Sequence, residues 1–348
     1  MNRKLQKITS IILVVIMFLS CVPLNGWTTT GLLNFTVKAA EEEKKLQIGN
    51  ASELVSFAKN VNAGNTYAGY TVVLTANIDM SDVAWSPIGY NFNNYFAGVF
   101  DGKNHTISNL NSSISIDAAN IINTPYHTIG LFGMCSSATI SNIILENTKF
   151  SITNSSGYQN DYSSIDGTCV FAGGVCGYAE NTTISNVIVS NTTISSYTGA
   201  EAGRAYAGGI VGYARNGCNI TYCSVESGSV SGKSDSSVAD CVAGGIVGEM
   251  LNEGSIARCA NRAAVDGGHS ISAAYTGGIC GKASNSSSTL SMIRDCYNTG
   301  NVLHTGSWLE TGYVGGIIGY SYSTVINCYS AGAVKANTNT VGGSVNVN

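Results

Sequence analysis

The sequence predicts an all-β chain folded as a right-handed parallel β-helix, a solenoid of about seven to eight coils with a short N-terminal capping helix. Three observations lead to this prediction. A Gly-x-x-Gly element recurs at intervals of 27 to 44 residues, short Val- and Ile-rich segments fill each interval, and only three of the 348 residues are proline. Segments of this length cannot each bury an apolar face alone, whereas stacked coils share one core.

The first forty residues are typical of a removable export signal. Three basic residues stand within residues 1–7, residues 8–21 are mostly apolar, and the Val-Lys-Ala-Ala run at 37–40 offers cleavage sites after either alanine. An apolar run of about 14 residues is shorter than a membrane-spanning helix and suits a signal sequence. We therefore assign residues 1–40 to a signal peptide. The alternative is a lipoprotein signal with Cys21 as the lipidated residue.

Residues 41–45, Glu-Glu-Glu-Lys-Lys, form a charged linker, and residues 46–69 form an N-terminal cap. Within the cap, four apolar side chains fall on one helical stripe, and Asn50 or Ser52 can cap the first turn. Since the open edge of a first coil would template aggregation, we expect a short helix over residues 51–61 to cover it. The stripe consists of Leu54, Phe57, Ala58 and Val61.

Residues 70–348 contain the repeat, and its most regular element is Gly-x-x-Gly. A bend between strands, closely stacked on the next coil, leaves no room for a Cβ and so explains the glycines. Residues 98–101 are a degenerate early copy and residues 343–346 a broken late one. The regular copies begin at Gly130, Gly174, Gly209, Gly245, Gly278 and Gly316.

Two further apolar segments follow each Gly-x-x-Gly element. The first reads Thr-Ile-Ser-Asn at 106–109, 139–142 and 183–186, and later copies keep an Ile or Val three residues before a Cys. The segments are short, bounded by Gly, Asn and Ser, and lack a 3.6-residue period, so they are interpreted as strands. A leucine-rich repeat, the alternative solenoid, would need a helix in each period. The second segment contributes Phe150, Ile194, Val230, Val265, Val302 and Val334.

Three copies carry a longer motif, Gly-Gly-x-x-Gly-Tyr, at 173–178, 208–213 and 315–320. Together with the segment at 74–107, this motif resembles the GLUG-motif repeat of bacterial secreted proteins, over about residues 46–346. The resemblance implies a β-helical fold. It implies no particular activity, because GLUG repeats are found in adhesin-like cell-surface proteins and in non-catalytic parts of some bacterial immunoglobulin A proteases.

The chain has eleven cysteines, of which Cys21 leaves with the leader. Four of the remaining ten occupy a repeat column that Ile143 and Val187 fill in earlier coils, so we expect a buried stack of free thiols. Disulfides between neighbouring coils of this stack are the alternative, although in-register parallel strands rarely offer the geometry. The stacked residues are Cys223, Cys259, Cys296 and Cys328; Cys176 and Cys280 replace Val or Ile in Gly-x-x-Gly. A disulfide is more readily expected among Cys135, Cys169, Cys218 and Cys241, which lie outside these columns.

Composition and charge narrow the range of partners. Charged residues make up 11% of the chain, and its formal net charge of −4 becomes −8 when the leader is removed. Because the chain has no basic run to displace counterions from a phosphate backbone, nucleic acid is excluded as a partner. No second apolar run of about 18 residues follows the leader, so no membrane span is expected in the mature chain.

No motif assigns catalytic, cofactor-binding or metal-binding residues. The sequence has no His-Glu-x-x-His, no Cys-x-x-Cys and no Gly-x-Ser-x-Gly elbow with plausible partners. Two groups of charges share a repeat segment, Arg294 with Asp295 and Glu253 with Arg258, and they suit solvation of an outer face. The histidines, all expected in solvated turns or loops, are His105, His127, His269 and His304.

Recurrent length variation indicates a recognition face. The insertions follow the third apolar position of successive coils, so they project from one side of the rod, which in solenoids is often the binding side. Ring-bearing side chains among Ser, Gly and Asn suit contact with a glycan or a protein. Those in or beside the insertions are Tyr158, Tyr162, Tyr197, Tyr206, His269, Tyr275, Trp308 and Tyr313.

These observations predict a secreted or cell-surface protein that binds a glycan or a host or microbial surface protein without catalysis. The alternative is a carbohydrate-active β-helix enzyme, either a polysaccharide lyase or a glycoside hydrolase, because this fold hosts clustered carboxylates on an outer face. Turnover of a glycan would distinguish the two.

Overall fold

The computed structural model describes residues 44–116, 126–155, 169–199, 203–235, 239–268, 273–285, 290–305, 311–336 and 346–347. The chain divides into two units, Met1–Glu42 and Glu43–Asn348. The expected signal peptide lies outside the described residues and stays a prediction. All described elements belong to the second unit.

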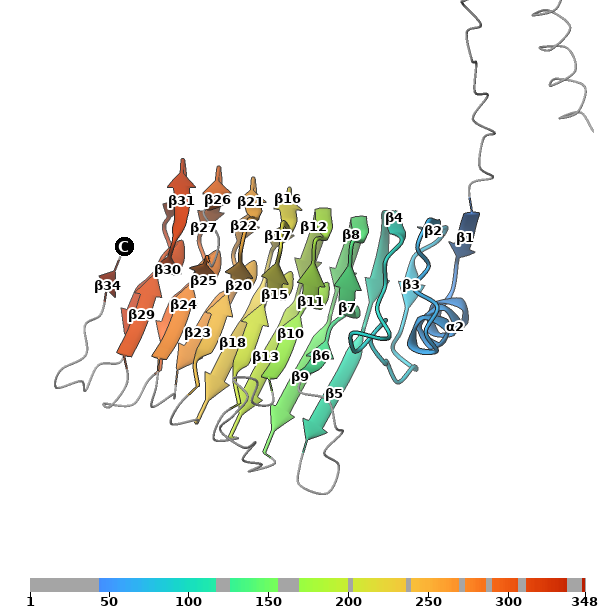
Figure 1. The fold of residues 1–348 in the computed structure, drawn as a ribbon, viewed down its shortest axis with the longest axis horizontal. Helices are drawn as coiled ribbons and strands as arrows, with labels where there is room; N and C mark the ends of the chain where they lie inside the picture. The colour runs from blue at the N-terminus through green and yellow to red at the C-terminus, as the bar shows by residue number, and fades with distance from the viewer. Residues whose placement is uncertain are drawn as a thin grey trace, which may run out of the picture. The chain divides into compact units, whose positions relative to one another are not determined.

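Four parallel sheets run along the second unit, and each coil passes through them in the order I, II, III, IV (Figure 1). Sheet I contains β6 (Tyr126–Ile129), β10 (Cys169–Gly173), β14 (Ala205–Gly208), β19 (Cys241–Gly244), β24 (Ala273–Gly277), β29 (Thr311–Gly315) and β34 (Asn346–Val347). Sheet II contains β7 (Phe132–Ser136), β11 (Cys176–Glu180), β15 (Val211–Arg215), β20 (Val247–Leu251), β25 (Cys280–Ser284) and β30 (Ile318–Ser321).

Sheet III begins with β1 (Lys44–Ile48), β2 (Tyr70–Leu74), β3 (Ile78–Asp79), β4 (Val99–Ser108), β8 (Thr139–Glu146) and β12 (Thr183–Ser190). Its later coils contribute paired short strands, which are β16 (Asn219–Thr221), β17 (Ser224–Val225), β21 (Ser255–Ala257), β22 (Ala260–Asn261), β26 (Ser291–Arg294), β27 (Tyr297–Asn298), β31 (Ser323–Ile326) and β32 (Tyr329–Ser330). Sheet IV contains β5 (Asn111–Ile116), β9 (Lys149–Asn154), β13 (Thr192–Thr198), β18 (Gly228–Ser234), β23 (Ala264–Gly268), β28 (Val302–His304) and β33 (Val334–Ala336).

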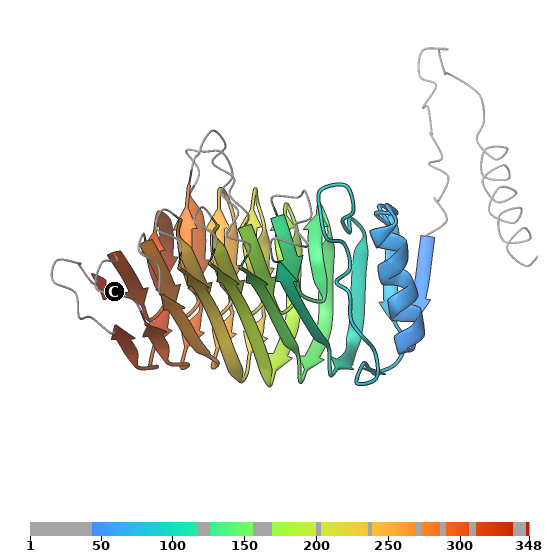
Figure 2. The same ribbon diagram turned by 90° about the horizontal axis from the view of Figure 1, so that it is seen from below.

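The predicted parallel β-solenoid is confirmed, and its coils stack side by side along one axis (Figure 2). Repeat positions pair in register from coil to coil; for example, Ile184 lies between Ile140 and Ile220. All three side chains are fully buried in one continuous core. Each coil therefore supplies a narrow apolar strip that only its neighbours can cover.

The predicted capping helix is α2 (Ala51–Asn62), which ends the solenoid beside β1 and β2 (Figure 1). The Asn50 side chain accepts a hydrogen bond from the Glu53 amide at 3.0 Å, and the Glu53 carboxylate accepts one from the Gly49 amide at 2.7 Å. This reciprocal arrangement satisfies amides that the first turn leaves free. The predicted stripe is buried, and its Phe57 ring lies 5.7 Å from that of Phe96.

Asparagines at the bends of sheet III and before sheet IV stack on one another. Asn142 and Asn186 have φ of 56° and 54°, a left-handed conformation that Asn tolerates better than most residues. The Asn186 amide donates to Asn142 Oδ1 at 2.8 Å, and the Asn191 amide donates to Asn147 Oδ1 at 2.6 Å. This explains why Thr-Ile-Ser ends in Asn in the regular early copies.

The number of coils is slightly lower than predicted. Six coils pass through all four sheets in the part of the chain that the structure describes. The early copy at 98–101 is not an I–II bend, because Phe100 pairs with Ile140 in sheet III. The first Thr-Ile-Ser-Asn was also misaligned: β4 bulges after Asp101, so Ile107 pairs with Leu145. Residues 343–345 of the late copy lie outside the described residues.

Three of the stacked thiols, those of Cys223, Cys259 and Cys296, are buried as predicted, and Cys328 is partly buried. The ten cysteines after residue 40 form no disulfide. The disulfide expected among Cys135, Cys169, Cys218 and Cys241 is therefore not formed. The physical reason is their placement: Cys135, Cys218 and Cys241 lie in the solenoid interior, whereas Cys169 lies in a separate cluster on the outer face. Along the described ranges, no helix is both long and apolar enough to cross a membrane.

Among the stacked thiols, Cys328 is expected to react first with iodoacetamide in the folded protein. Cys259 is 1% exposed, whereas Cys328, in the last coil, is partly exposed. A hydrogen bond with Cys223 and burial raise the pKa of Cys259 well above its usual value, so little reactive thiolate forms there. Peptide mass spectrometry before and after unfolding checks this. Equal native labelling of Cys259 and Cys328 would contradict the buried stack.

Candidate functional site

The Gly-Gly-x-x-Gly motif forms the bend from sheet I to sheet II. A Cβ on Gly208 would overlap the carbonyl oxygen of Val211 in its own coil, and one on Gly209 would overlap that of Gly245 in the next coil. The bend is therefore closed by backbone packed against backbone. The residue after the last glycine, Tyr213 in this coil, belongs to β15 and lies outside the core with the outer aromatic cluster.

Outward side chains of sheet I stack along the solenoid. The ring centroids of Phe171 and Tyr206 are 5.0 Å apart with an interplanar angle of 11°, and those of Tyr275 and Tyr313 are 5.1 Å apart at 10°. Val242 occupies the register position between Tyr206 and Tyr275, so the row of rings is interrupted there.

Outward side chains of sheet II pack against this row. The Tyr213 ring lies 5.4 Å from that of Phe171 and 5.2 Å from that of Tyr206, and Tyr320 contacts Tyr275 and Tyr313 in the same way, at 5.4 and 5.0 Å. We call the combined surface the outer ladder. It consists of Phe171, Tyr206, Val242, Tyr275 and Tyr313 from sheet I and Met134, Tyr178, Tyr213, Glu249, Lys282 and Tyr320 from sheet II.

Two charged residues interrupt the sheet II side of the outer ladder. Glu249 and Lys282 occupy the motif position that is Tyr in neighbouring coils, and they pair in register on β20 and β25. Their side chains are only 7% and 17% exposed. Glu249 lies in the same coil as Val242, the residue at which the sheet I row is also broken.

The Lys282 ammonium is the centre of the interruption. It lies 3.2 Å from Asp240 Oδ2, 3.8 Å from Glu249 Oε1 and 4.5 Å from the centroid of the Tyr275 ring. Ser284 donates a hydrogen bond to the same carboxylate oxygen of Glu249. An ammonium held by two carboxylates and a ring face leaves hydrogen-bonding oxygens beside aromatic surface, which suits a polyhydroxylated ligand.

Burial controls the electrostatics of this site. Desolvation raises the pKa of Glu249, an effect that Lys282 and the Ser284 hydroxyl oppose. Desolvation likewise raises the pKa of Tyr178 to about 12 and that of Tyr206 well above its usual value. Both hydroxyls are therefore protonated at neutral pH, and the rings that carry them are only 2% and 4% exposed.

The raised pKa of Glu249 predicts how its replacement changes with pH. The ordinary pKa of a Glu carboxyl is 4.5, and the folded protein holds the Glu249 proton to a higher pH than the unfolded chain does. Binding of this proton therefore stabilises the folded state fully below pH 4.5, and the stabilisation is lost as the pH rises through the pKa of Glu249 in the folded state. Compared with Glu249→Gln, the unmodified protein is expected to lose Tm between about pH 4.5 and neutrality. Thermal melts at several pH values check this, and a Tm difference independent of pH would contradict it.

The predicted recognition residues are only partly where the sequence placed them. Tyr206, Tyr275 and Tyr313 lie on strands β14, β24 and β29 and not in loops, and these three join the outer ladder. Tyr197 also lies on a strand, β13, where its hydroxyl donates to Asp235 at 2.7 Å. The insertions are shorter than the sequence predicts, because the sheet IV strand before them and the sheet I strand after them each extend into the predicted ranges. Tyr158, Tyr162, His269 and Trp308 lie outside the described residues.

The predicted solvated histidines are a second correction. His127 and His304 lie on β6 and β28 and are 6% and 3% exposed, and His105 lies on β4. Burial lowers the pKa of His127, which favours its neutral form. In sheet I it pairs with the fully buried Val170, so strand pairing and not a solvated loop sets its surroundings.

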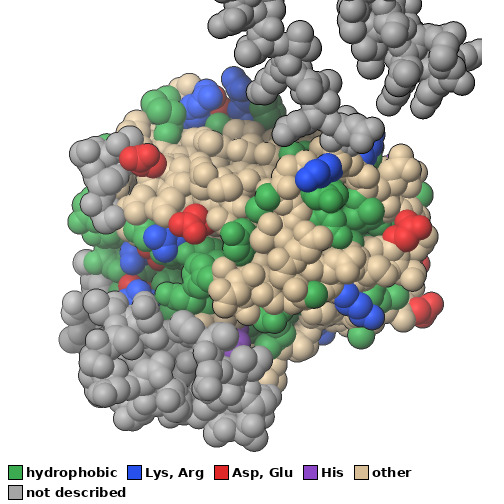
Figure 3. Space-filling model, turned by 45° about the vertical axis from the view of Figure 1, so that its right-hand side comes forward, with side chains coloured by type: hydrophobic (Ala, Val, Ile, Leu, Met, Phe, Trp, Pro, Cys, Tyr) green, Lys and Arg blue, Asp and Glu red, His purple; other side chains and the backbone are tan. Residues whose placement is uncertain are grey.

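The charges singled out in the sequence do not gather into a site. Arg294 and Asp295 form an ion pair at 3.3 Å, while Arg258 hydrogen-bonds the Tyr222 hydroxyl and lies over that ring at 5.2 Å. On the face drawn in Figure 3, basic and acidic side chains are interspersed and neither sign forms a broad patch. The residues that the structure describes include no group of three or more His, Cys, Asp or Glu arranged to hold a metal ion.

Sequence reasoning missed the interruption by Glu249 and Lys282, although its signal is readable. The sixth position of Gly-Gly-x-x-Gly-Tyr is Glu in one coil and Lys in the next, opposite charges separated by one repeat. In a parallel solenoid such positions are neighbours in space. Asp240 gave no comparable signal, because it precedes β19 by one residue and falls in no repeat column.

Comparisons with known proteins agree with this architecture. The GLUG motif family matches residues 203–231 and 310–335. A crystal structure of a candidate immunoglobulin A1 protease from Bacteroides ovatus is similar over 86% of this chain and 79% of that chain, with 23% identity and a TM-score of 0.56. An IgA1 protease structure aligns with 89% of this chain, which spans 22% of that protein, with 16% identity and a TM-score of 0.44. No curated protein matches the sequence. The similarity to the Bacteroides ovatus structure supports the β-solenoid fold.

Proposed function

We propose that this GLUG-motif β-solenoid is exported to the cell surface or beyond and binds an extracellular ligand without catalysis. Export is supported by the order of three segments within residues 1–40: a basic segment, then an apolar segment, then small residues at the expected cleavage site. The ligand site is the partly exposed part of the outer ladder around Lys282, Tyr275 and Tyr313. The ligand is a glycan, with a host or microbial surface protein as the second class.

The observation that carries this proposal is the charged interruption of the outer ladder. A buried ion pair contributes little to stability compared with apolar residues of similar volume, and here Tyr is the residue found in neighbouring coils. Glu249 and Lys282 are therefore better explained by recognition than by folding. Paired charges of both signs beside rings provide donors, acceptors and apolar contact, the combination that sugar hydroxyls and C–H faces require.

A second candidate function, cleavage of a polysaccharide, is favoured by the carboxyl groups of Asp240 and Glu249. Both approach one ammonium, so the two oxygens lie no more than about 7 Å apart, an upper bound compatible with the carboxyl pairs of glycoside hydrolases. The raised pKa of Glu249 also suits a general acid. Lys282 occupies the space between them, however, which favours binding over catalysis.

Screening the protein on an array of host and microbial glycans, followed by analysis for new reducing ends or unsaturated sugars, tests the proposal. We expect selective binding, no products, and loss of binding in Glu249→Gln. Glu53→Gln, which changes an exposed carboxylate in α2, is the matched control. Absence of glycan binding would overturn the glycan assignment, and product formation abolished by Glu249→Gln would establish the enzyme instead.

A further inference from the structure

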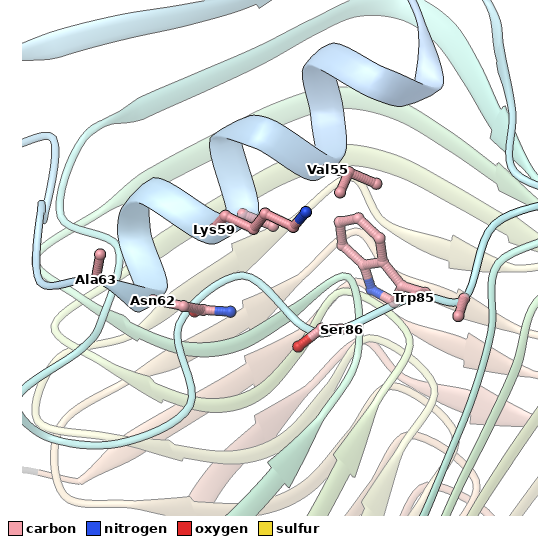
Figure 4. A pocket seen from close by; sticks show the side chains of 8 residues that line it. Val55, Lys59, Asn62, Ala63, Trp85 and Ser86 are labelled. Carbon is pink, nitrogen blue, oxygen red and sulfur yellow. The ribbon is translucent and has the colours of Figure 1, made fainter.

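A cavity of about 380 Å³ lies between α2 and the segment around Trp85, on the N-terminal cap and apart from the outer ladder (Figure 4). Its size is that of a site for a small ligand. Its lining residues are Val55, Ala58, Lys59, Asn62, Ala63, Ala84, Trp85 and Ser86.

Two polar contacts fix the walls of this cavity. The Trp85 indole N–H donates to the Gly130 carbonyl at 3.0 Å, which anchors one edge of the ring while the other edge extends toward Val55 (Figure 4). The Asn62 amide donates to the Pro87 carbonyl at 3.0 Å and accepts from the Gly89 amide at 2.8 Å. Both functions of this side chain are used, so it shapes the cavity and leaves the indole as its main apolar wall.

Lys59 is the charged residue of the lining, and its side chain extends across the cavity toward Trp85 (Figure 4). Among the described residues it has no acidic partner within ion-pair distance. The helix carbonyls near it are already bonded: Lys59 O, Asn60 O and Val61 O accept backbone amides, and Asn62 O accepts the Asn94 side chain. The C-terminal turn of α2 contributes a partial negative charge but no carboxylate, so the exposed Lys59 ammonium keeps its net charge.

We propose that this cavity binds a carboxylated sugar residue, a uronic or sialic acid. Trp85 is 5% exposed, and the apolar face of the sugar ring packs on the part of its indole that lines the cavity. The carboxylate pairs with the Lys59 ammonium, and the exposed Ser86 hydroxyl bonds a ring hydroxyl. A neutral sugar would leave the ammonium unpaired. An aromatic acid would use the indole and the ammonium but not the hydroxyl.

Titration of ¹⁵N-labelled protein with glucuronic acid, N-acetylneuraminic acid and glucose tests this site. The reporter is the Trp85 indole N–H resonance, assigned through Trp85→Phe. We expect a saturable shift with at least one sugar acid and none with glucose. In Lys59→Gln, which changes an exposed helix residue, affinity is expected to fall about tenfold, the effect of losing one charge-assisted hydrogen bond.

Lys149→Gln is the matched control, because Lys149 is exposed and lies outside the cavity lining, and it is expected to leave the affinity unchanged. An equal shift with glucose, retained affinity in Lys59→Gln, or no shift with either acid would overturn the proposal. Glu249 and Lys282 lie outside the cavity lining. A negative result for the cavity therefore leaves the proposed ligand site on the outer ladder untouched, and a negative result for the outer ladder leaves the cavity proposal untouched.

Discussion

Gly208→Ala is expected to destabilise the solenoid by more than about 4 kcal/mol or to prevent soluble folding. The added Cβ would overlap the Val211 carbonyl oxygen, which belongs to the same tight bend. Backbone cannot move there without breaking the pairing of β14 with β10 and β19. The measurement is the urea midpoint of unfolding, or the soluble fraction if the variant does not fold.

Gly199→Ala is the matched control for this change. The nearest atom to a Cβ at Gly199 is the Tyr197 hydroxyl oxygen at 3.2 Å, the end of a side chain that can shift. We expect a change of less than about 1 kcal/mol. If Gly208→Ala were as stable as Gly199→Ala, the close backbone packing at the I–II bend would be wrong.

Lys282→Met is expected to lower the free energy of unfolding by about 3 kcal/mol at neutral pH. The substitution removes the cation shared by Asp240 and Glu249 while their side chains stay 23% and 7% exposed. Protonation of Glu249 relieves part of this penalty, so the loss is expected to be smaller at acidic pH. Denaturant unfolding at two pH values measures both effects.

Lys103→Met provides the comparison for an exposed ion pair. Lys103 lies 2.7 Å from Asp101, but its side chain is 56% exposed. Such pairs contribute about 0 to 1 kcal/mol, so this variant is expected to unfold close to the unmodified protein. If Lys282→Met and Lys103→Met lowered the free energy of unfolding equally, the ion pairs of Lys282 would be solvated like that of Lys103, and the charged interruption would not be a preorganised site.

The fold was predictable because each coil repeats the same physical solution. Three residue types recur in register from coil to coil, and each can be recognised in the sequence. They are glycine at backbone contacts, branched apolar residues or Cys in the core, and Asn at left-handed bends. The capping helix was equally readable, since its stripe and Asn50 cap are local. The alignment of the first Thr-Ile-Ser-Asn segment, at 106–109, was wrong because β4 bulges after Asp101, and tertiary packing sets this bulge.

The candidate site was less accessible to sequence reasoning. An aromatic in a polar segment reads as a loop residue, but Tyr206 and Tyr275 are outward residues of strands whose opposite faces carry small core residues such as Ala207 and Ala274. The interruption combines Glu249, Lys282 and Asp240, which lie on three different coil segments. The contact of Lys282 with Asp240 depends on side-chain reach, which periodicity does not encode.

The most direct test of the account replaces both charges by the residue found in neighbouring coils. When Asp240→Asn accompanies Glu249→Tyr/Lys282→Tyr, no unpaired carboxylate remains and the outer ladder becomes continuous on sheet II. We therefore expect a Tm equal to or above that of the unmodified chain together with loss of its glycan-array signals. An unchanged binding profile in a folded triple variant would contradict the claim that this interruption was built for recognition.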